Sequence, residues 1–368
     1  MLTYPACSKK SAFRTTNFYR NFPLKSDHAK NPPSSQDPLA ETPAIPTGKK
    51  ISFFKKCRYY CEFLALSLLA KGIPLMPYGA IHPLAKCLGF IFFQLDSRGR
   101  AVALDNLRAA FGDTYSPLDR ARIARQACQN FARTMLCLFW SPNLRADNYQ
   151  NYIHIEGLDN HPIHKDKTAP GVYFLTHFSN FEWLSLGSSF AVTPGLVITQ
   201  TFKNPLLGPI FDRLRAQGGH TIIPPSRALI RMIKLLRSGG KVGAASDLSI
   251  DPKHGAVPIK CFGLWTSMSP MTGILAERGG ARLVPSQIFP DQDGFFRIVY
   301  HPPLELPEDA THRQIAQACW DIMEPVIRKN PELWLWHYKQ WRYKPSDEPG
   351  DKYPFYSNTA KRFDEILP

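Results

Sequence analysis

The chain has 368 residues, of which 44% are hydrophobic, so it can bury a sizeable core in one large domain or two smaller ones. Its 45 basic and 30 acidic residues give a formal net charge of +15 and favour an anionic partner, such as nucleic acid, an acidic membrane surface or a phosphorylated substrate. The 8 cysteines are scattered, which excludes the paired spacing of a zinc framework and the density of a small disulfide-bonded domain. We therefore expect reduced, mostly buried cysteines and a location facing the cytosol.

The first 48 residues have the composition of a disordered leader. They are rich in Pro, Ser, Lys and Asn and show no helical or strand periodicity, so they cannot offset the entropy of ordering. The apolar segment of a secretory signal is missing, although the stretch is basic and poor in acidic residues, as transit peptides are. Disorder over residues 1–48 is the preferred interpretation, and the fold is expected to start at residue 49.

Residues 49–100 contain two apolar stretches, 63–70 and 84–95, flanked by basic residues. Neither reaches the roughly 18 uninterrupted apolar residues of a membrane-spanning helix. We predict helices that lie in a membrane interface, with basic side chains toward lipid phosphates and aromatic rings at headgroup depth. Two ordinary core helices are the alternative.

Residues 101–140 have apolar side chains at helical spacing, with Gly112 ending one helix and Ser116-Pro117 opening the next. Beyond them, apolar strand candidates alternate with helix candidates. The strand candidates are 172–176, 195–200, 220–224, 241–246, 282–289 and 296–301, and the helix candidates are 180–190, 207–217, 226–238, 267–278 and 311–329. The alternation predicts an α/β fold with a mostly parallel or mixed central sheet flanked by helices, over residues 101–344, with 345–368 as a polar tail.

The stretch GVYFLTHFSNFEWLSL, residues 171–186, contains the strongest candidate site. A histidine followed five positions later by an acidic residue occurs three times, at His154, His161 and His177, so this spacing alone is uninformative. Only His177 ends a predicted strand and precedes a predicted helix, and ligands usually bind at the carboxyl edge of strands in an open α/β sheet. Asp247 follows the apolar run 241–246 and is expected at the same edge, with a turn residue as the alternative.

Two roles are open for Glu182. With Ser179 as N-cap it would complete a capping box, and Phe178 and Trp183 would form a hydrophobic staple. It could also accept a hydrogen bond from one ring nitrogen of His177, so that the other nitrogen takes a proton from a hydroxyl group. The two roles are compatible, and the residues alone do not choose between catalysis, capping and metal binding.

Other ligand classes have weaker support. The run WHYKQWRYK, residues 336–344, interleaves aromatic rings with cations as single-strand binders do, but no nucleic-acid module surrounds it. A zinc hydrolase would need at least three ligands, and the sequence has no HExxH motif. We therefore expect no nucleic-acid partner, no metal and no cofactor.

Six blocks in order resemble the bacterial lipid A late acyltransferases, the lauroyl and myristoyl transferase group within the membrane-bound glycerolipid acyltransferases. His177 to Glu182 is similar to their His-x4-Asp/Glu motif, and the likeness covers roughly residues 55–344. The other blocks are DSRGRAVALDNLRAAFG, IHIEGLDN, FKNPLLGPIFDRLRAQGG, LLRSGGKVGAASDLS with GAVPIKCFG, and PELWLWHYKQWRY.

The resemblance implies an acyltransferase that moves a fatty acyl chain from an acyl-carrier-protein or acyl-CoA thioester to a hydroxyl of a glycolipid, at the cytosolic face of the inner membrane. It implies that His177 is the general base and that Glu182 orients it, without a covalent acyl-enzyme. The substrate-binding residues that it implies are Ser179, Asn180, Gln200, Lys203, Asn204 and Asp247.

Two positions depart from the family pattern. Gln200 stands where an arginine is usual, four residues before the Asn-Pro pair, and Leu248 follows Asp247 where a glutamine is usual. An arginine there would bind phosphate or the oxyanion, and Lys203 is a candidate substitute. The alternatives are a divergent acyltransferase acting on another lipid, such as a lysophospholipid, and a non-catalytic membrane-binding protein. The Pro-Glu-Gly-Thr block of lysophosphatidic acid acyltransferases is missing.

Overall fold

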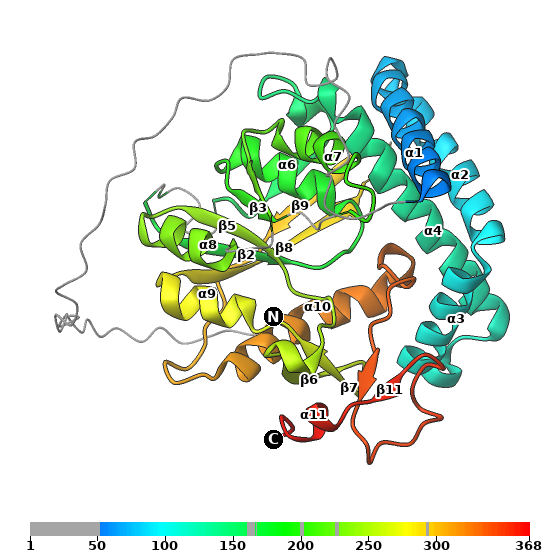
Figure 1. Cartoon of the computed structure of the whole chain (residues 1–368). Helices are drawn as coiled ribbons and strands as arrows, with labels where there is room; N and C mark the ends of the chain where they lie inside the picture. The colour runs from blue at the N-terminus through cyan, green and yellow to red at the C-terminus, as the bar shows by residue number, and fades with distance from the viewer. Residues whose placement is uncertain (1–51, 160–165, 167, 199–201, 225–227, 292–293) are drawn as a thin grey trace, which may run out of the picture. The chain divides into compact units, whose positions relative to one another are not determined.

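The computed structural model of the chain describes most of the residues after the leader (Figure 1). The described residues are 52–159, 166, 168–198, 202–224, 228–291 and 294–368. They belong to one compact unit, Ile45–Pro368. The predicted disordered leader and Gln200 lie outside the described residues.

Four long helices come first and confirm the predicted helical N-terminal part. They are α1 (Phe53–Gly72), α2 (Ile81–Leu95), α3 (Ser97–Phe111) and α4 (Pro117–Trp140). Gly112 takes a φ of 55° after α3, a conformation that favours glycine, and the Ser116 hydroxyl accepts a hydrogen bond from the Asp119 N–H to cap α4. Among the described helices, none combines the length and the apolar character needed to cross a membrane.

A seven-stranded mixed sheet follows, in the order β1-β9-β8-β2-β5-β3-β4. Neighbouring strands are parallel except for β8 and β9, which are antiparallel. The strands are β1 (Ile153–Glu156), β2 (Gly171–Leu175), β3 (Leu196–Ile198), β4 (Thr221–Ile223), β5 (Lys241–Ala245), β8 (Arg282–Pro290) and β9 (Phe296–Tyr300). The predicted α/β class with a mixed sheet is confirmed.

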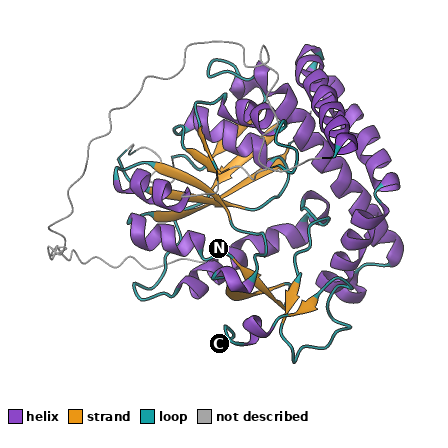
Figure 2. Cartoon of the chain, in the orientation of Figure 1, coloured by secondary structure: helices purple, strands orange, loops and turns teal. Residues whose placement is uncertain are grey.

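Helices cover both faces of this sheet (Figures 1 and 2). On one side lie α6 (Phe181–Ala191) and α7 (Gly208–Ala216), and on the other α8 (Ala228–Arg237), α9 (Met271–Gly279) and α10 (His312–Lys329). Side chains alternate along a strand, so Tyr173 of β2 packs into the core with Trp183, while Val172 and Phe174 pack with Met232. Coverage of both faces explains why β2 is continuously apolar.

One hairpin was not predicted. β6 (Val257–Cys261) and β7 (Leu264–Met268) pair antiparallel, and α9 begins only at Met271, so the predicted helix 267–278 starts too early. The connecting residues Phe262 and Gly263 both have positive φ, at 53° and 80°. A two-residue turn of this kind usually contains Asn or Gly at its first position, and phenylalanine rarely takes a positive φ, so Phe262 does not signal a turn.

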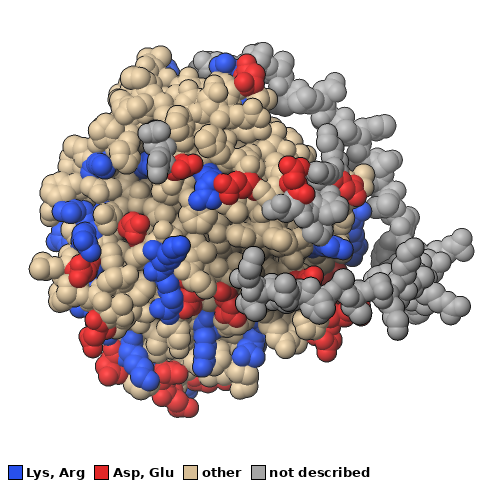
Figure 3. Space-filling model, turned by 180° about the vertical axis from the view of Figure 1, so that it is seen from behind, with Lys and Arg blue, Asp and Glu red and all other residues tan. Residues whose placement is uncertain are grey.

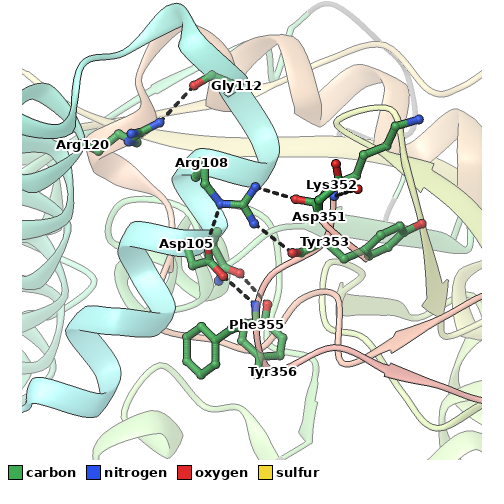
Figure 4. A network of polar contacts seen from close by, with 10 residues as sticks. Asp105, Arg108, Gly112, Arg120, Asp351, Lys352, Tyr353, Phe355 and Tyr356 are labelled. Atoms are coloured by element: carbon green, nitrogen blue, oxygen red, sulfur yellow. Dashed lines mark hydrogen bonds and ion pairs between the residues drawn. The ribbon is translucent and has the colours of Figure 1, made fainter. Parts of the chain in front are cut away.

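The C-terminal residues were expected to form a polar tail, but they pack on α3. β10 (Tyr343–Lys344) pairs with β11 (Asn358–Thr359). Arg108 of α3 donates to the carbonyls of Asp351 and Tyr353, and Asp105 accepts from the Phe355 N–H (Figure 4). The composition of this segment is polar, but its aromatic side chains Tyr353, Tyr356 and Phe363 are buried and supply its contact with the core.

The formal charge of +15 is not gathered on the face opposite to that of Figure 1. Lys and Arg side chains on that face lie mainly in its lower half and are mixed there with Asp and Glu (Figure 3). The upper part of the same face has few charged side chains. Where the described residues form this face, they present a mixed surface rather than the single-sign surface of nucleic-acid binders.

Candidate active site

The paired strands β2 and β5 bring His177 and Asp247 together. Leu175 and Ala245 end their strands and lie opposite each other in the parallel register. His177 and Asp247 each follow the end of their strand by two residues, so both emerge at the carboxyl edge of the sheet. This is the edge at which ligands bind in open α/β sheets, and the predicted position of both residues is confirmed.

The Asp247 carboxylate accepts three hydrogen bonds. Its Oδ1 lies 2.7 Å from His177 Nδ1, and its Oδ2 accepts from the His177 backbone N–H at 2.8 Å and from the Trp334 indole N–H at 2.9 Å. Because an ionised carboxylate only accepts, Nδ1 of His177 carries the proton. The other ring nitrogen, Nε2, has no hydrogen-bond partner among the described residues and keeps its lone pair available.

The electrostatics of this pair favour an ionised Asp247 beside a basic imidazole. Burial lowers the pKa of His177, but the charge and the hydrogen bond of Asp247, helped by the charge of Glu182, outweigh burial and raise the pKa above its usual value of 6.5. Burial raises the pKa of Asp247, but His177 and the Trp334 hydrogen bond bring it below the usual value. The pair is therefore a carboxylate-supported base.

Glu182 forms a different pair from the one that the motif implied. Its carboxylate receives two hydrogen bonds from Arg215 of α7, from Nε at 3.0 Å and from Nη2 at 2.5 Å. Both side chains are largely buried, with 6% of Glu182 and 20% of Arg215 exposed. In the described structure the hydrogen-bonding partner of His177 is Asp247, and Glu182 acts on His177 only through its charge.

The loop between His177 and α6 is fixed at several points. Ser179 has a φ of 52°, and it lies outside the helix, so the cap of α6 is Asn180, whose Oδ1 accepts from the Trp183 N–H at 3.2 Å. The expected capping box with Ser179 as N-cap is therefore wrong. The Ser179 N–H donates to the Leu333 carbonyl at 2.7 Å, and its carbonyl accepts from the Thr134 hydroxyl at 2.9 Å. These bonds hold a strained residue in place beside the site.

Lys203 and Asn204 lie at the contact with α1. The Asn204 amide donates to the Tyr59 carbonyl and to the Glu62 carboxylate, and its oxygen accepts from the Leu206 N–H. The Lys203 carbonyl accepts from the Tyr59 hydroxyl at 2.7 Å, and the Lys203 side chain is exposed. Neither residue has a hydrogen bond or ion pair with His177 in the part of the chain that the structure describes.

Sequence reasoning missed the roles of Arg215 and Trp334. Both lie in segments that resemble family blocks, FDRLRAQGG and PELWLWHYKQWRY, but an arginine or a tryptophan by itself does not signal a catalytic contact. Trp334 is buried among Phe262, Trp320 and Trp336, and residue 178 pairs with it in an isolated antiparallel bridge. The last part of the described chain thus forms one wall of the site.

An imidazole that is hydrogen-bonded to a buried carboxylate through one ring nitrogen can remove a proton from a hydroxyl group with the other. Together with its place at the carboxyl edge of an α/β sheet, this arrangement is typical of enzymes that use general-base catalysis. The described residues contain no group of three or more His, Cys, Asp or Glu side chains that could hold a metal ion.

Comparison with known proteins gives the class of enzyme. The model of the bacterial lipid A biosynthesis acyltransferase family matches residues 48–343, and the chain belongs to this family. It is an acyltransferase that works on lipid.

Two curated relatives cover most of the chain. The lipid A biosynthesis lauroyltransferase of Escherichia coli (strain K12) is 24% identical over 303 residues, which are 79% of this chain and 94% of the relative. The lipid A biosynthesis acyltransferase of Haemophilus influenzae (strain ATCC 51907 / DSM 11121 / KW20 / Rd) is 22% identical over 318 residues, with 80% and 94% covered. The crystal structure of a 1-acyl-sn-glycerophosphate acyltransferase from Thermotoga maritima has 13% identity and a TM-score of 0.33, over 70% of this chain and 99% of that one.

Proposed function

We propose that the chain transfers a fatty acyl group from an acyl-carrier-protein or acyl-CoA thioester to a hydroxyl of a glycolipid resembling a lipid A precursor. The observation that carries this proposal is the bond between His177 Nδ1 and Asp247, which leaves Nε2 of a partly buried imidazole free. The relatives that are named for lipid A biosynthesis support a glycolipid as the acceptor. The reaction needs no metal or cofactor, because the thioester itself supplies an activated acyl group.

His177 is the general base of the proposed reaction. Nε2 takes the proton of the acceptor hydroxyl while the hydroxyl oxygen attacks the thioester carbonyl. The C–S bond then breaks, and the leaving thiolate takes the proton back from the imidazolium. Asp247 holds the ring in the tautomer that this step requires and stabilises the imidazolium by its charge. Trp334 in turn holds the Asp247 carboxylate, so Trp334 is a positioning residue.

Arg215 is the best candidate for the cation that the family pattern placed at position 200. Its bidentate pair with Glu182 uses Nε and Nη2, so Nη1 takes no part in that pair. The charge of Arg215 acts on the pKa of His177, which supports a place close to the reacting groups. In this proposal Glu182 orients Arg215, and Arg215 binds the oxyanion or a substrate phosphate. Lys203 is the competing candidate, and Lys203→Ala should leave the rate within about twofold if Arg215 has this role.

The surface of α1 and α2 supports a location in the interface of the inner membrane, at its cytosolic face. Large apolar side chains of both helices are exposed to solvent. They are Phe53, Phe54, Tyr60, Leu64, Leu68 and Leu69 on α1, and Leu88, Phe90, Ile91, Phe92 and Leu95 on α2. Exposed apolar side chains at this density mark interaction surfaces, and Lys55, Lys56 and Lys71 on α1 suit a lipid headgroup layer.

The test compares the lipids of cells that express the wild type, His177→Ala or His154→Ala at matched levels. His154 is a matched control because it also precedes an acidic residue by five positions but lies on β1 and pairs with Asp291. Mass spectrometry of total glycolipids and phospholipids should show a species heavier by one acyl chain with the wild type and His154→Ala only. The mass of that species identifies the chain length and the acceptor class.

Identical lipid profiles with the wild type and His177→Ala, in cells that contain lipid A precursors, would contradict the proposed mechanism. A new acyl chain on a phospholipid rather than on a glycolipid would support His177 as the base and would identify a phospholipid as the acceptor. In both cases the purified enzyme with defined acyl donors provides the second measurement, because it separates a missing donor from a missing activity.

A further inference from the structure

A cavity of about 580 Å³ lies outside the site described above, between α2, α4 and the end of β8. Figure 1 shows α2 and α4 side by side. The cavity is lined by polar residues at helical spacing, His82 and Lys86 on α2 and Asn130 and Arg133 on α4. Two walls of the same cavity thus present cationic side chains to the same space.

Arg133 is a buried cation without a carboxylate partner. It is 7% exposed, its Nη2 donates to the Gly294 carbonyl at 2.5 Å, and its guanidinium lies 4.2 Å from the centroid of the Phe296 ring. No Asp or Glu of the described residues comes within ion-pair distance of it. A buried charge is costly unless it is paired, so in the described part of the chain Arg133 is available to an anionic ligand in the cavity that it lines.

The neighbours of Arg133 strengthen this conclusion. Lys86 lines the cavity as a second cation, and it likewise has no acidic partner within ion-pair distance among the described residues. Burial and the charges of Arg133 and Lys86 lower the pKa of His82, so its ring is a neutral hydrogen-bonding group near pH 7. Asp291 and Glu332 also line the cavity, and Asp291 faces His154 at 3.6 Å.

We propose that this cavity binds the phosphate ester group of an anionic lipid, held by Arg133 and Lys86. A phosphate monoester carries a charge of about −1.5 to −2 and three acceptor oxygens, which suits two cations from different helices better than a planar carboxylate does. The apolar side chains Leu88 and Phe92 are exposed on α2 beyond Lys86, where the acyl chains of such a lipid would lie.

The cavity shares a wall with the loop that follows His177. Leu333 lines the cavity, and its carbonyl accepts the Ser179 N–H. Asn130 of the cavity wall donates to the Glu332 carbonyl. His177 does not line the cavity, so a phosphate ester bound at Arg133 does not take the place of the hydroxyl that reacts at His177 Nε2. This binding does not depend on acyl transfer, and it remains testable if the proposed function fails.

Isothermal titration of the full-length protein tests the proposal with two soluble probes, dihexanoyl phosphatidic acid below its micellar concentration and inorganic phosphate. Lys86→Ala should weaken binding of the phosphatidic acid about tenfold, and Arg133→Gln about 10- to 100-fold, as expected for losing a hydrogen-bonded ionic contact. Arg98→Ala is the matched control, because Arg98 is an exposed arginine of α3 that does not line the cavity, and it should change the affinity less than twofold.

The two probes distinguish the source of the phosphate. Binding of both with the same loss in the variants shows a site for phosphate itself, whereas binding of the phosphatidic acid alone shows a lipid headgroup site. Equal affinities of the wild type and Lys86→Ala would overturn the proposal, as would an equal loss in Arg98→Ala or a wild type that binds neither probe. Lys86 is exposed, so its variant keeps the test valid if Arg133→Gln does not fold.

Discussion

The carboxyl edge of the sheet and the first two helices differ in which side chains they bury. At the edge of the sheet the buried side chains are charged, with Asp247 at 1% and Glu182 at 6% exposure, and each has its hydrogen bonds. On α1 and α2 the side chains left in solvent are apolar, with Phe54 at 82% and Leu95 at 79% exposure. Both arrangements cost stability in an isolated soluble protein, so each indicates a function.

The two regions have different proposed roles, one in the chemical step and the other in the location of the enzyme. In the proposed reaction, the charged groups at the edge of the sheet control the chemical step, because they set the tautomer and the basicity of His177. The apolar helices are proposed to determine where it occurs, through contact with the membrane interface. Substitutions in the first region should change the rate constant of the chemical step, and substitutions in the second should change membrane binding only.

The largest effect is expected for Asp247→Asn. It should lower kcat by roughly 10²- to 10⁴-fold with little change in KM, because the amide no longer selects the reactive tautomer of His177. The His177 pKa is raised above 6.5, so the wild-type rate should rise with pH through a value above 6.5 as the imidazole loses its proton. In Asp247→Asn the residual rate should rise at a lower pH. A pH profile of kcat checks this, and an unchanged midpoint would show that Asp247 does not act on His177.

The next effect concerns the buried pair of Glu182 and Arg215. Glu182→Gln should destabilise the fold by about 3–5 kcal/mol, because it removes the charge of the carboxylate that is hydrogen-bonded to a largely buried guanidinium. Urea unfolding measures this loss, and the double variant Glu182→Gln/Arg215→Met should regain a large part of it. If Glu182 instead oriented His177 directly, its variant would shift the pH midpoint of kcat as far as Asp247→Asn does.

A smaller effect is expected for Trp334→Phe. The change removes one hydrogen bond to Asp247 and keeps most of the aromatic volume, so kcat should fall about 10-fold at fixed KM. The pH midpoint of kcat is the informative measurement, since a purely structural role would leave it in place. Trp341→Phe is the matched control, because Trp341 is a fully buried tryptophan of the same segment with no bond to Asp247.

The smallest effect on catalysis is expected for the double variant Leu64→Ser/Leu68→Ser on α1. Each leucine is exposed, at 60% and 62%, so the free energy of unfolding should change by less than about 0.5 kcal/mol per site. The fraction bound to vesicles of phosphatidylethanolamine and phosphatidylglycerol should fall at least fivefold in flotation. Turnover of a soluble short-chain substrate should stay within twofold. Leu118→Ser, an exposed leucine of α4, should change neither.

The local patterns of the sequence were sufficient for most elements and for the position of the site. Apolar runs bounded by glycine and proline predict β2 and β5, and their shared carboxyl edge places His177 beside Asp247. The local pattern fails where a partner is distant along the chain. The family motif and the first-turn position of Glu182 suggested it as the partner of His177, whereas the actual partner is 70 positions away and Glu182 binds a residue 33 positions away.

The remaining errors have the same physical origin. Ser179 and Asn180 are both good N-cap residues, and the choice between them depends on the backbone bonds of Ser179 to Leu333 and Thr134, which no local pattern contains. The C-terminal segment has a polar composition, and its order depends on contacts of a few aromatic residues with α3. Gln200 lies outside the described residues, so its expected role in substrate binding stays a prediction.

The contact between Trp334 and Asp247 has a consequence for protein synthesis. The ribosome makes the chain from its N-terminus, so His177 and Asp247 are translated well before the residue that completes their hydrogen bonds. The hydrogen bond from the Ser179 N–H likewise cannot form until Leu333 has been translated. A nascent or truncated chain that ends before this segment therefore lacks the hydrogen bonds of the finished site, which form only after residues 333 and 334 have been translated.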